Sequence, residues 1–423
     1  LRRAARCRGG TATVISIPRG SLPPLALSLV AAMSLGAQSA PPSSPTSRTD
    51  DERGSIDLAF GDEMRLSMGG YLQVDGRWAS GPQSRAPDGL LLRRARLVFD
   101  ASRADGWHVR LQPDFGQGRV LVQDAFVGWR DRRTTARIGR FRPAYGTERM
   151  QSSSTLLFPE RSIVNTLMPS RSMGAQVTHQ RGHVTVAAGG FRTPIGSDVP
   201  VVDTDGDVRA TNGVGYDLLG RANWRVVRGS RYADIQGSLL AGQERGTAEN
   251  PAVARLLSVG QLPLVVFRDG ATEATTVIAD GARGRWSLGG VLGTARTMVG
   301  VERAQQWQRL RFAAARQQVQ ATAWSLRAAT AWGGTRNANQ EITPRHRRGA
   351  LELGVRAGQL QLDTPAGVTL LADGSRPLVR TAGAAVGWIP TISTRLSVAL
   401  DVTWPGFGGS TERVAVMRWQ QGF

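Results

Sequence analysis

Polar and apolar residues alternate with a period of two in many short stretches of this chain. The stretches Tyr71–Trp78, Trp107–Phe115 and Ala350–Ala357 each place apolar side chains at every second position and charged or amide side chains between them. Successive side chains of a strand point to opposite faces, so each stretch has one apolar face and one charged face. Clusters of Gly, Asp, Asn and Pro separate these stretches to the end of the chain. The pattern predicts many short antiparallel strands.

A soluble β-sandwich would also alternate, but the amount of charge on the polar faces favours a barrel in a membrane. No later stretch offers the roughly 20 uninterrupted apolar residues that a membrane helix needs. The longest candidate, Leu256–Phe267, is interrupted by Pro263. Strands satisfy their backbone groups in lipid only when the barrel is closed. The predicted fold class is therefore all-β, a closed antiparallel transmembrane β-barrel with lipid outside and water inside.

Aromatic residues near the predicted strand ends fit the girdles that barrels present at the two membrane surfaces. These residues are Trp78, Trp107, Trp129, Trp224 and Tyr232. The end of the chain resembles a terminal barrel strand, because its apolar residues share one face and its last residue is aromatic. The apolar face of this strand carries Ala415, Met417, Trp419 and Phe423.

The N-terminal segment predicts export. Arginines precede the apolar run Leu22–Ala37, and small residues follow at Ser39 and Ala40, which is the order of a secretory signal. We therefore expect a signal peptide at residues 1–40, a polar periplasmic linker at 41–60 and a barrel at 61–423. Cys7 is the single cysteine and falls in the signal, so we expect no disulfide and no cysteine metal ligand in the mature protein.

All 53 basic residues are arginines, and against 33 acidic residues they give a formal charge of +20. Such a chain attracts anions, which include nucleic acid, lipid headgroups and small anionic solutes. Export argues against nucleic acid. Small inorganic anions and membrane lipid are therefore the expected partners, and no cofactor is expected.

Several blocks in a fixed order resemble the phosphate-selective porin O/P family. The resemblance implies a 16-stranded barrel, a homotrimer in the outer membrane of a Gram-negative bacterium, and a constriction loop folded inward at about Pro143–Pro169. The blocks that carry it are Leu92–Phe99, Trp107–Phe115, Val122–Trp129, Ile138–Gly146, Phe158–Arg161, Pro169–Arg171 and Gly349–Arg356.

The resemblance also implies an anion site. In the family a basic residue and a following serine pair occupy the constriction, and an arginine pair and an aspartate stand on early strands. The matching positions here are Arg149, Ser152, Ser153, Arg93, Arg94 and Asp124. Strand periodicity adds Arg96 and Arg110 to a predicted inward column of arginines. Guanidinium groups and hydroxyls can replace the water that an anion sheds in a narrow pore.

The predicted function is passive anion uptake through an arginine-lined, water-filled channel, with phosphate or polyphosphate as the expected solute. The best-known members of the family use lysines at the constriction and this chain has none, so other anions stay open. An enzymatic, structural or anchoring barrel is the alternative, although no catalytic motif such as a nucleophile elbow or P-loop occurs. Asp203, Asp205 and Asp207 resemble the start of a calcium loop, and an acidic surface loop is the alternative interpretation.

Overall fold

The computed structural model describes the chain from residue 55 onward, with gaps in several connections. The described residues are 55–80, 88–118, 120–192, 201–202, 208–209, 214–253, 256–261, 263–265, 267–270, 272–364, 368, 377–406 and 410–423. The expected signal peptide and the calcium candidates Asp203, Asp205 and Asp207 lie outside these residues.

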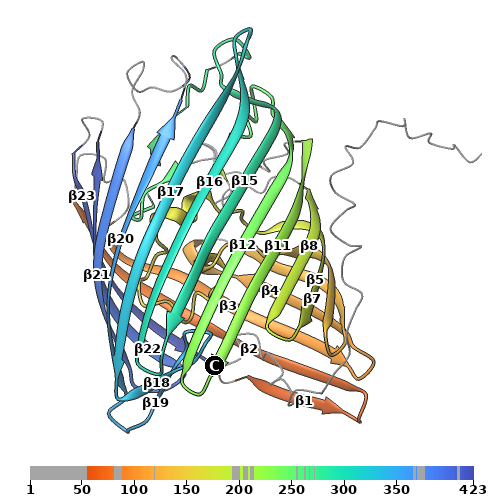
Figure 1. The fold of residues 1–423 in the computed structure, drawn as a ribbon, viewed down its shortest axis with the longest axis vertical. Helices are drawn as coiled ribbons and strands as arrows, with labels where there is room; N and C mark the ends of the chain where they lie inside the picture. Colours follow the sequence, from red (N-terminus) through yellow and green to blue (C-terminus); the bar gives the residue numbers. More distant parts are fainter. Residues whose placement is uncertain are drawn as a thin grey trace, which may run out of the picture. The chain divides into compact units, whose positions relative to one another are not determined.

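The main sheet is a closed antiparallel barrel (Figure 1). It holds 17 strands, and 16 of them remain when β1, which pairs with β2 alone, is set aside. This confirms the predicted fold class. The sixteen strands are β2 (Met64–Ser80), β3 (Gly89–Arg103), β4 (Trp107–Asp114), β5 (Leu121–Arg130), β6 (Thr134–Phe141), β7 (Ser172–Arg181), β8 (Val184–Arg192), β11 (Val214–Arg228), β12 (Arg231–Arg245), β15 (Ile278–Gly293), β16 (Thr297–Phe312), β17 (Ala315–Trp332), β20 (Ala350–Asp363), β21 (Leu378–Ile389), β22 (Thr394–Pro405) and β23 (Glu412–Gly422).

The barrel closes between its last strand and its first. β23 pairs with β2 in a register that runs from Tyr71 opposite Gly422 to Ser80 opposite Arg413. Two backbone hydrogen bonds extend this seam, from Gly70 N to Phe423 O at 2.8 Å and from Phe423 N to Gly70 O at 3.1 Å. Closure gives each of the sixteen described barrel strands a partner on both sides, which is the physical condition for a membrane barrel.

The strand β1 (Ile56–Phe60) corrects the expected linker at 41–60. It forms a hairpin with the start of β2, and Ile56, Leu58 and Phe60 lie opposite Met68, Leu66 and Met64. These cross-strand apolar pairs stabilise a hairpin. The sheet therefore begins at Ile56, inside the segment that composition alone assigns to a linker.

The alternation along the strands places charged residues inside and apolar residues outside. On β20 Glu352 and Arg356 are buried in the lumen, whereas Leu353 and Val355 are exposed on the outer face. Trp78, Trp107 and Trp224 are also exposed near strand ends. Tyr232 is a correction to the predicted girdle, because only 5% of it is exposed. It falls on the inward positions of β12, one residue out of phase with the lipid face.

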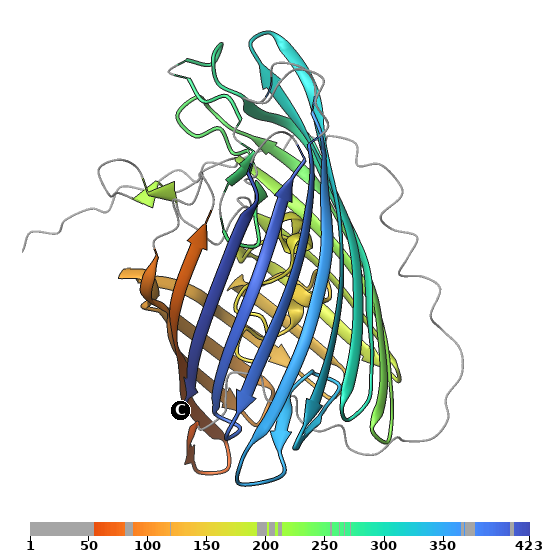
Figure 2. The same cartoon turned by 90° about the vertical axis from the view of Figure 1, so that its left-hand side faces the viewer.

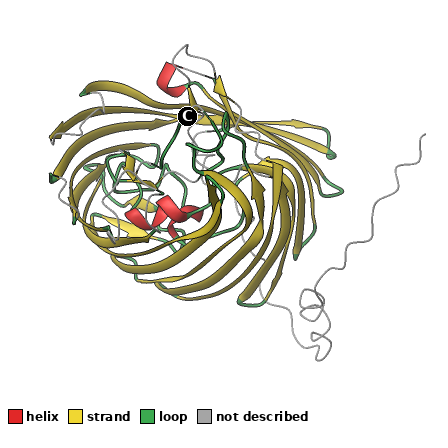
Figure 3. Cartoon of the chain, turned by 90° about the horizontal axis from the view of Figure 1, so that it is seen from above, coloured by secondary structure: helices red, strands yellow, loops and turns green. Residues whose placement is uncertain are grey.

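Two connections fold into the lumen. The first, residues 142–171, carries the helical turns η3 (Glu148–Met150) and η4 (Ile163–Leu167), which are drawn inside the ring of strands (Figures 2 and 3). We call it the inner loop. The second, residues 246–277, includes the short strands β13 (Leu256–Leu257) and β14 (Pro263–Val265), and we call it the covering loop. Within the described part of the chain, every helix is too short and polar to cross a membrane.

Candidate functional site

A β-bulge turns two consecutive arginines into the lumen. The register between β2 and β3 shifts so that Gln73 lies opposite Arg94 and Val74 lies opposite Leu92, which leaves Arg93 as the extra residue. A bulge re-aims a side chain that strict alternation would send to the other face. Arg93 therefore reaches Glu160 of the inner loop at 2.7 Å, and Arg94 donates to Gln73 Oε1 at 2.6 Å.

The neighbouring Arg96 joins the inner loop to the wall of the barrel. It donates to Asp114 Oδ2 at 2.6 Å and to the hydroxyl of Tyr71 at 2.8 Å. That hydroxyl lies 2.6 Å from Ser153 Oγ. The predicted Arg94, Arg96 and Ser153 are thus gathered on one wall, formed by β2 and β3. Ser152 instead lies 2.9 Å from the hydroxyl of Ser154 within the loop.

Most other lumen arginines are ion-paired, so the predicted column is not a row of uncompensated charges. Arg110 donates to Asp100 at 2.7 Å, and Arg171 donates to Asp124 at 2.7 Å. Arg418 and Arg356 hold Asp75 and Asp401 in the same way. Ion pairing lowers the net charge of the lumen wall. Whether a given arginine can bind an anion therefore depends on where its guanidinium lies.

Arginines on β20, β22 and β23 hold the inner loop through its backbone carbonyls. Arg418 donates to Pro159 O at 2.6 Å, Arg356 to Glu160 O at 2.7 Å and Arg395 to Leu156 O at 3.4 Å. Each of these side chains also bonds a carboxylate on the barrel wall. They position the loop across the lumen, which is a structural role that the sequence pattern does not distinguish from anion binding.

A second group of guanidiniums gathers where the inner loop leaves and rejoins the barrel. Arg142 donates to Arg149 O at 2.8 Å, Arg149 to Pro169 O at 3.1 Å and Arg161 to Gln151 O at 2.7 Å. Arg171, which rejoins the wall, completes what we call the arginine cluster. Backbone carbonyls thus orient the guanidiniums of Arg142, Arg149 and Arg161, and Arg171 is paired with Asp124.

The pKa of Arg142 is governed by burial and by the charges around it in the cluster. Burial and then the like charges of Arg171, Arg161 and Arg149 hold the pKa of Arg142 well below its usual value. Among the charges that act on Arg142, Asp124 opposes this shift, but the same aspartate already accepts a hydrogen bond from Arg171. An anion bound among these like charges would relieve their repulsion. The prediction from sequence included Arg149 and Asp124 and missed Arg142, Arg161 and Arg171.

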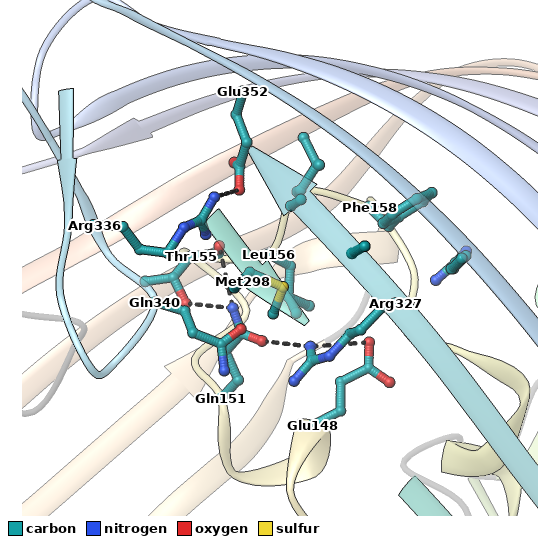
Figure 4. Close-up of a pocket in the computed structure, with 14 residues that line it drawn as sticks. Glu148, Gln151, Thr155, Leu156, Phe158, Met298, Arg327, Arg336, Gln340 and Glu352 are labelled. Carbon is teal, nitrogen blue, oxygen red and sulfur yellow. Dashed lines mark hydrogen bonds and ion pairs between the residues drawn. The ribbon is translucent and has the colours of Figure 1, made fainter. Parts of the chain in front are cut away.

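The opposite side of the inner loop is electrically balanced. Figure 4 shows a pocket there, between loop residues Gln151–Phe158 and the strands β16, β17 and β20. Arg327 lies 3.6 Å from Glu148, and Arg336 lies 2.7 Å from Glu352. Leu156, Phe158 and Met298 supply an apolar lining.

The covering loop lies against an apolar part of the inner wall. Leu310 near the end of β16, Val319 near the start of β17 and Leu362 near the end of β20 are each less than a tenth exposed. Leu256 of the covering loop packs in the same cluster. The loop also donates from Leu257 N to Thr166 Oγ1 of the inner loop at 2.7 Å. The same loop reaches β2 and β23, where Arg77 donates to Gly260 O and Ser258 Oγ donates to Glu412 Oε1 at 3.2 Å.

No group of three or more metal-ligating side chains occurs in the part of the chain that the structure describes. A sequence profile of the phosphate-selective porin O and P family matches residues 67–369. The chain belongs to this family. It is accordingly a porin of the outer membrane. No curated protein matches this porin significantly in sequence.

Solved structures of other porins share the fold of this porin at low sequence identity. OmpT of Vibrio cholerae has a TM-score of 0.56 and 10% identity over 86% of this chain and 100% of its own. DcaP of Acinetobacter baumannii has a TM-score of 0.56 and 9% identity over 86% and 99%. The anion-selective porin from Comamonas acidovorans has a TM-score of 0.52 and 10% identity over 85% and 100%. At these identities the likeness shows the fold alone.

Proposed function

We propose that this porin is a passive anion channel whose path follows the wall formed by β2–β8, past the arginine cluster and the group of Arg94, Arg96 and Ser153. The observation that carries the proposal is the arginine cluster, in which backbone carbonyls of the inner loop orient three guanidiniums where the loop meets the barrel. Burial and then the like charges of its other members lower the pKa of Arg142. An anion that enters a narrow pore replaces lost water with hydrogen bonds from such groups. The porin from Comamonas acidovorans, a similar fold, is anion-selective and supports the same direction.

Inorganic oxyanions such as phosphate are the solutes that suit this site best. A guanidinium presents two parallel donors that match two oxygens of a phosphate, and a serine hydroxyl adds a third. Several sites of moderate strength along one wall let an ion leave again, as conduction requires. Selectivity for phosphate would then arise from arginine and serine donors, without lysine.

Recordings from the protein in planar bilayers test the proposal. Under a KCl gradient we expect a reversal potential of anion-selective sign, and we expect added phosphate to reduce the chloride current. Arg142→Gln and Arg149→Glu should each move the reversal potential toward cation selectivity, with the larger shift for the charge reversal. Arg303→Gln removes the same charge from the outer face of β16 and should leave the reversal potential unchanged.

The outcomes separate the parts of the proposal. An anion current that is indifferent to phosphate would leave a general anion porin. Selectivity that does not change in Arg142→Gln or Arg149→Glu would remove the arginine cluster from the path. No current at all would favour a structural or enzymatic barrel.

We propose further that the porin is a homotrimer. One solved structure of Vibrio cholerae OmpT, similar in fold at 10% identity and a TM-score of 0.54, is a trimer form. Chemical cross-linking of the protein in outer membranes should give a species of three chains that heating converts to one. A monomer as the largest cross-linked species would contradict this assembly.

A further inference from the structure

One rim of the barrel carries a ring of exposed arginines. At this rim the strands are joined by turns such as Gly182–His183 and Gly229–Ser230, whereas the connections at the other rim include residues 246–277. Short turns face the periplasm in outer-membrane barrels, so the arginine-rich rim is the periplasmic one. The C-terminal residue Phe423 lies at the same rim.

The charge of this periplasmic rim is strongly one-sided. The described turns at this rim, with the strand residues that bound them, hold 11 exposed arginines and 3 acidic residues, Asp105, Asp131 and Glu341. These turns are 104–106, 131–133, 182–183, 229–230, 294–296 and 333–349. The arginines are Arg103, Arg130, Arg132, Arg133, Arg181, Arg228, Arg231, Arg296, Arg345, Arg347 and Arg348. The turn of the β1–β2 hairpin adds Asp62 and Glu63 and leaves the balance positive. At the opposite rim the covering loop mixes Arg268 with Glu249, Asp269 and Glu273.

The turns after β3 and β5 form the densest part of this ring. Trp107 and Trp129 lie directly opposite each other on neighbouring strands, and the indole of Trp129 donates to Asp105 O at 3.2 Å. Asp131 turns its carboxylate toward the backbone amides of Arg133 and Thr134. That carboxylate is used by the turn itself, which leaves the guanidiniums of Arg130, Arg132 and Arg133 directed to the exterior.

Tryptophans place the ring at the level of lipid headgroups. Trp107, Trp224, Trp332 and Trp388 are each between 44% and 51% exposed near the periplasmic ends of their strands. Amphipathic rings sit at the interface between hydrocarbon and headgroups. Arg130, Arg132 and Arg133 lie one to four residues beyond Trp129, which pairs with Trp107, and this places them at the level of the phosphates of the inner leaflet. The ring runs around most of the circumference, which suits an annulus of lipids better than one docked protein.

We propose that the periplasmic rim binds anionic phospholipid headgroups of the inner leaflet, with its strongest site at Arg130, Arg132 and Arg133. A guanidinium fork matches a phosphodiester, and the extra negative charge of phosphatidylglycerol over phosphatidylethanolamine adds long-range attraction. Each arginine near an anionic surface contributes about a fivefold preference. The proposal does not depend on which anion passes through the pore.

Lipid retention by the purified protein tests the site. The porin is exposed in detergent to an equimolar mixture of phosphatidylglycerol and phosphatidylethanolamine, and the bound lipids are counted by native mass spectrometry. We expect the wild type to enrich phosphatidylglycerol at least severalfold and the variant R130Q/R132Q/R133Q to lose most of that enrichment. The control R309Q/R311Q/R316Q removes the same charge from the opposite ends of β16 and β17 and should keep the wild-type ratio.

Further outcomes distinguish a lipid surface from a protein-binding surface. Bound lipids in the bulk ratio for the wild type would overturn the proposal, as would equal losses in both triple variants. An acidic periplasmic protein that binds the wild type but not R130Q/R132Q/R133Q, with no lipid enrichment, would also overturn it and assign the rim to a protein partner. Heat-dependent gel migration of each variant shows that the barrel is folded.

Discussion

The guanidinium of Arg418 on the last barrel strand, β23, makes two hydrogen bonds of 2.6 Å with the carboxylate of Asp75 on the first barrel strand, β2. Both side chains are about 95% buried, since 4% and 5% of them remain exposed. The pair crosses the seam at which the barrel closes. The same guanidinium donates to Pro159 O, so one arginine joins the seam to the inner loop.

We expect Arg418→Ala to destabilise the barrel by on the order of 3 kcal/mol, because it leaves the Asp75 carboxylate buried without its partner. The measurement is the urea concentration at which folded protein, recognised by its faster migration in unboiled samples, is lost. In the double variant R418M/D75L the charge is removed from both sides, and most of the stability should return. A double variant as unstable as Arg418→Ala would show that the ion pair is not the cause.

A side chain at Gly70 would disturb the same seam. A Cβ there would lie 2.2 Å from Arg96 O and 3.0 Å from the ring of Phe423, so Gly70→Ala forces the backbone or the terminal ring to move. We expect a loss of about 1–3 kcal/mol and a lower yield of folded protein. Gly220→Ala is the matched control on β11, where a Cβ meets nothing within 4 Å. Equal effects of the two substitutions would contradict a steric cause.

The covering loop should limit conductance because it occupies part of the lumen. Leu256 is 1% exposed in its apolar cluster, and a carboxylate at this position would cost several kcal/mol if it stayed buried. Leu256→Asp should therefore release the loop and raise the single-channel conductance. Thr272→Asp adds the same charge at an exposed position of the loop and should leave conductance as it is. Unchanged conductance in both variants would mean that the ion path avoids the covered side.

The inner loop should stay in place at mildly acidic pH. Burial would raise the pKa of Glu160, but the charges of Arg93, Arg94 and Arg418 outweigh it and hold the pKa well below its usual value. A depressed carboxyl pKa contributes stability above the usual value of about 4.3 and loses it as pH falls further. We expect anion selectivity to be constant from pH 8 to 5 and to decline only in stronger acid. A change centred near pH 6 would identify another titrating group.

Strand periodicity predicted the barrel because a closed sheet between lipid and water imposes one rule on every strand. Every second side chain meets hydrocarbon, and this rule is local, so it can be read from Trp107–Phe115 without knowing any partner strand. Tyr232 was misassigned because an aromatic residue near a strand end fits either face, and only the register with its neighbours settles which one.

The candidate site was predicted only in part, since its residues depend on contacts between distant segments. Arg93 and Arg94 both reach the lumen because of a bulge, which a strict period of two forbids. Arg149 belongs to the arginine cluster, whereas Ser153 contacts Arg96, which lies outside that cluster. The roles of these residues in anion binding stay predictions.

The sequence by itself determined that this chain forms a barrel with an arginine-rich interior, because alternation and charge are properties of each strand. The tertiary structure alone decided which arginines are paired, which hold the inner loop and which form the cluster. The physical reason is distance along the chain. Arg418 meets Asp75 across 343 residues, and no local pattern records a partner that only closure of the barrel brings within 2.6 Å.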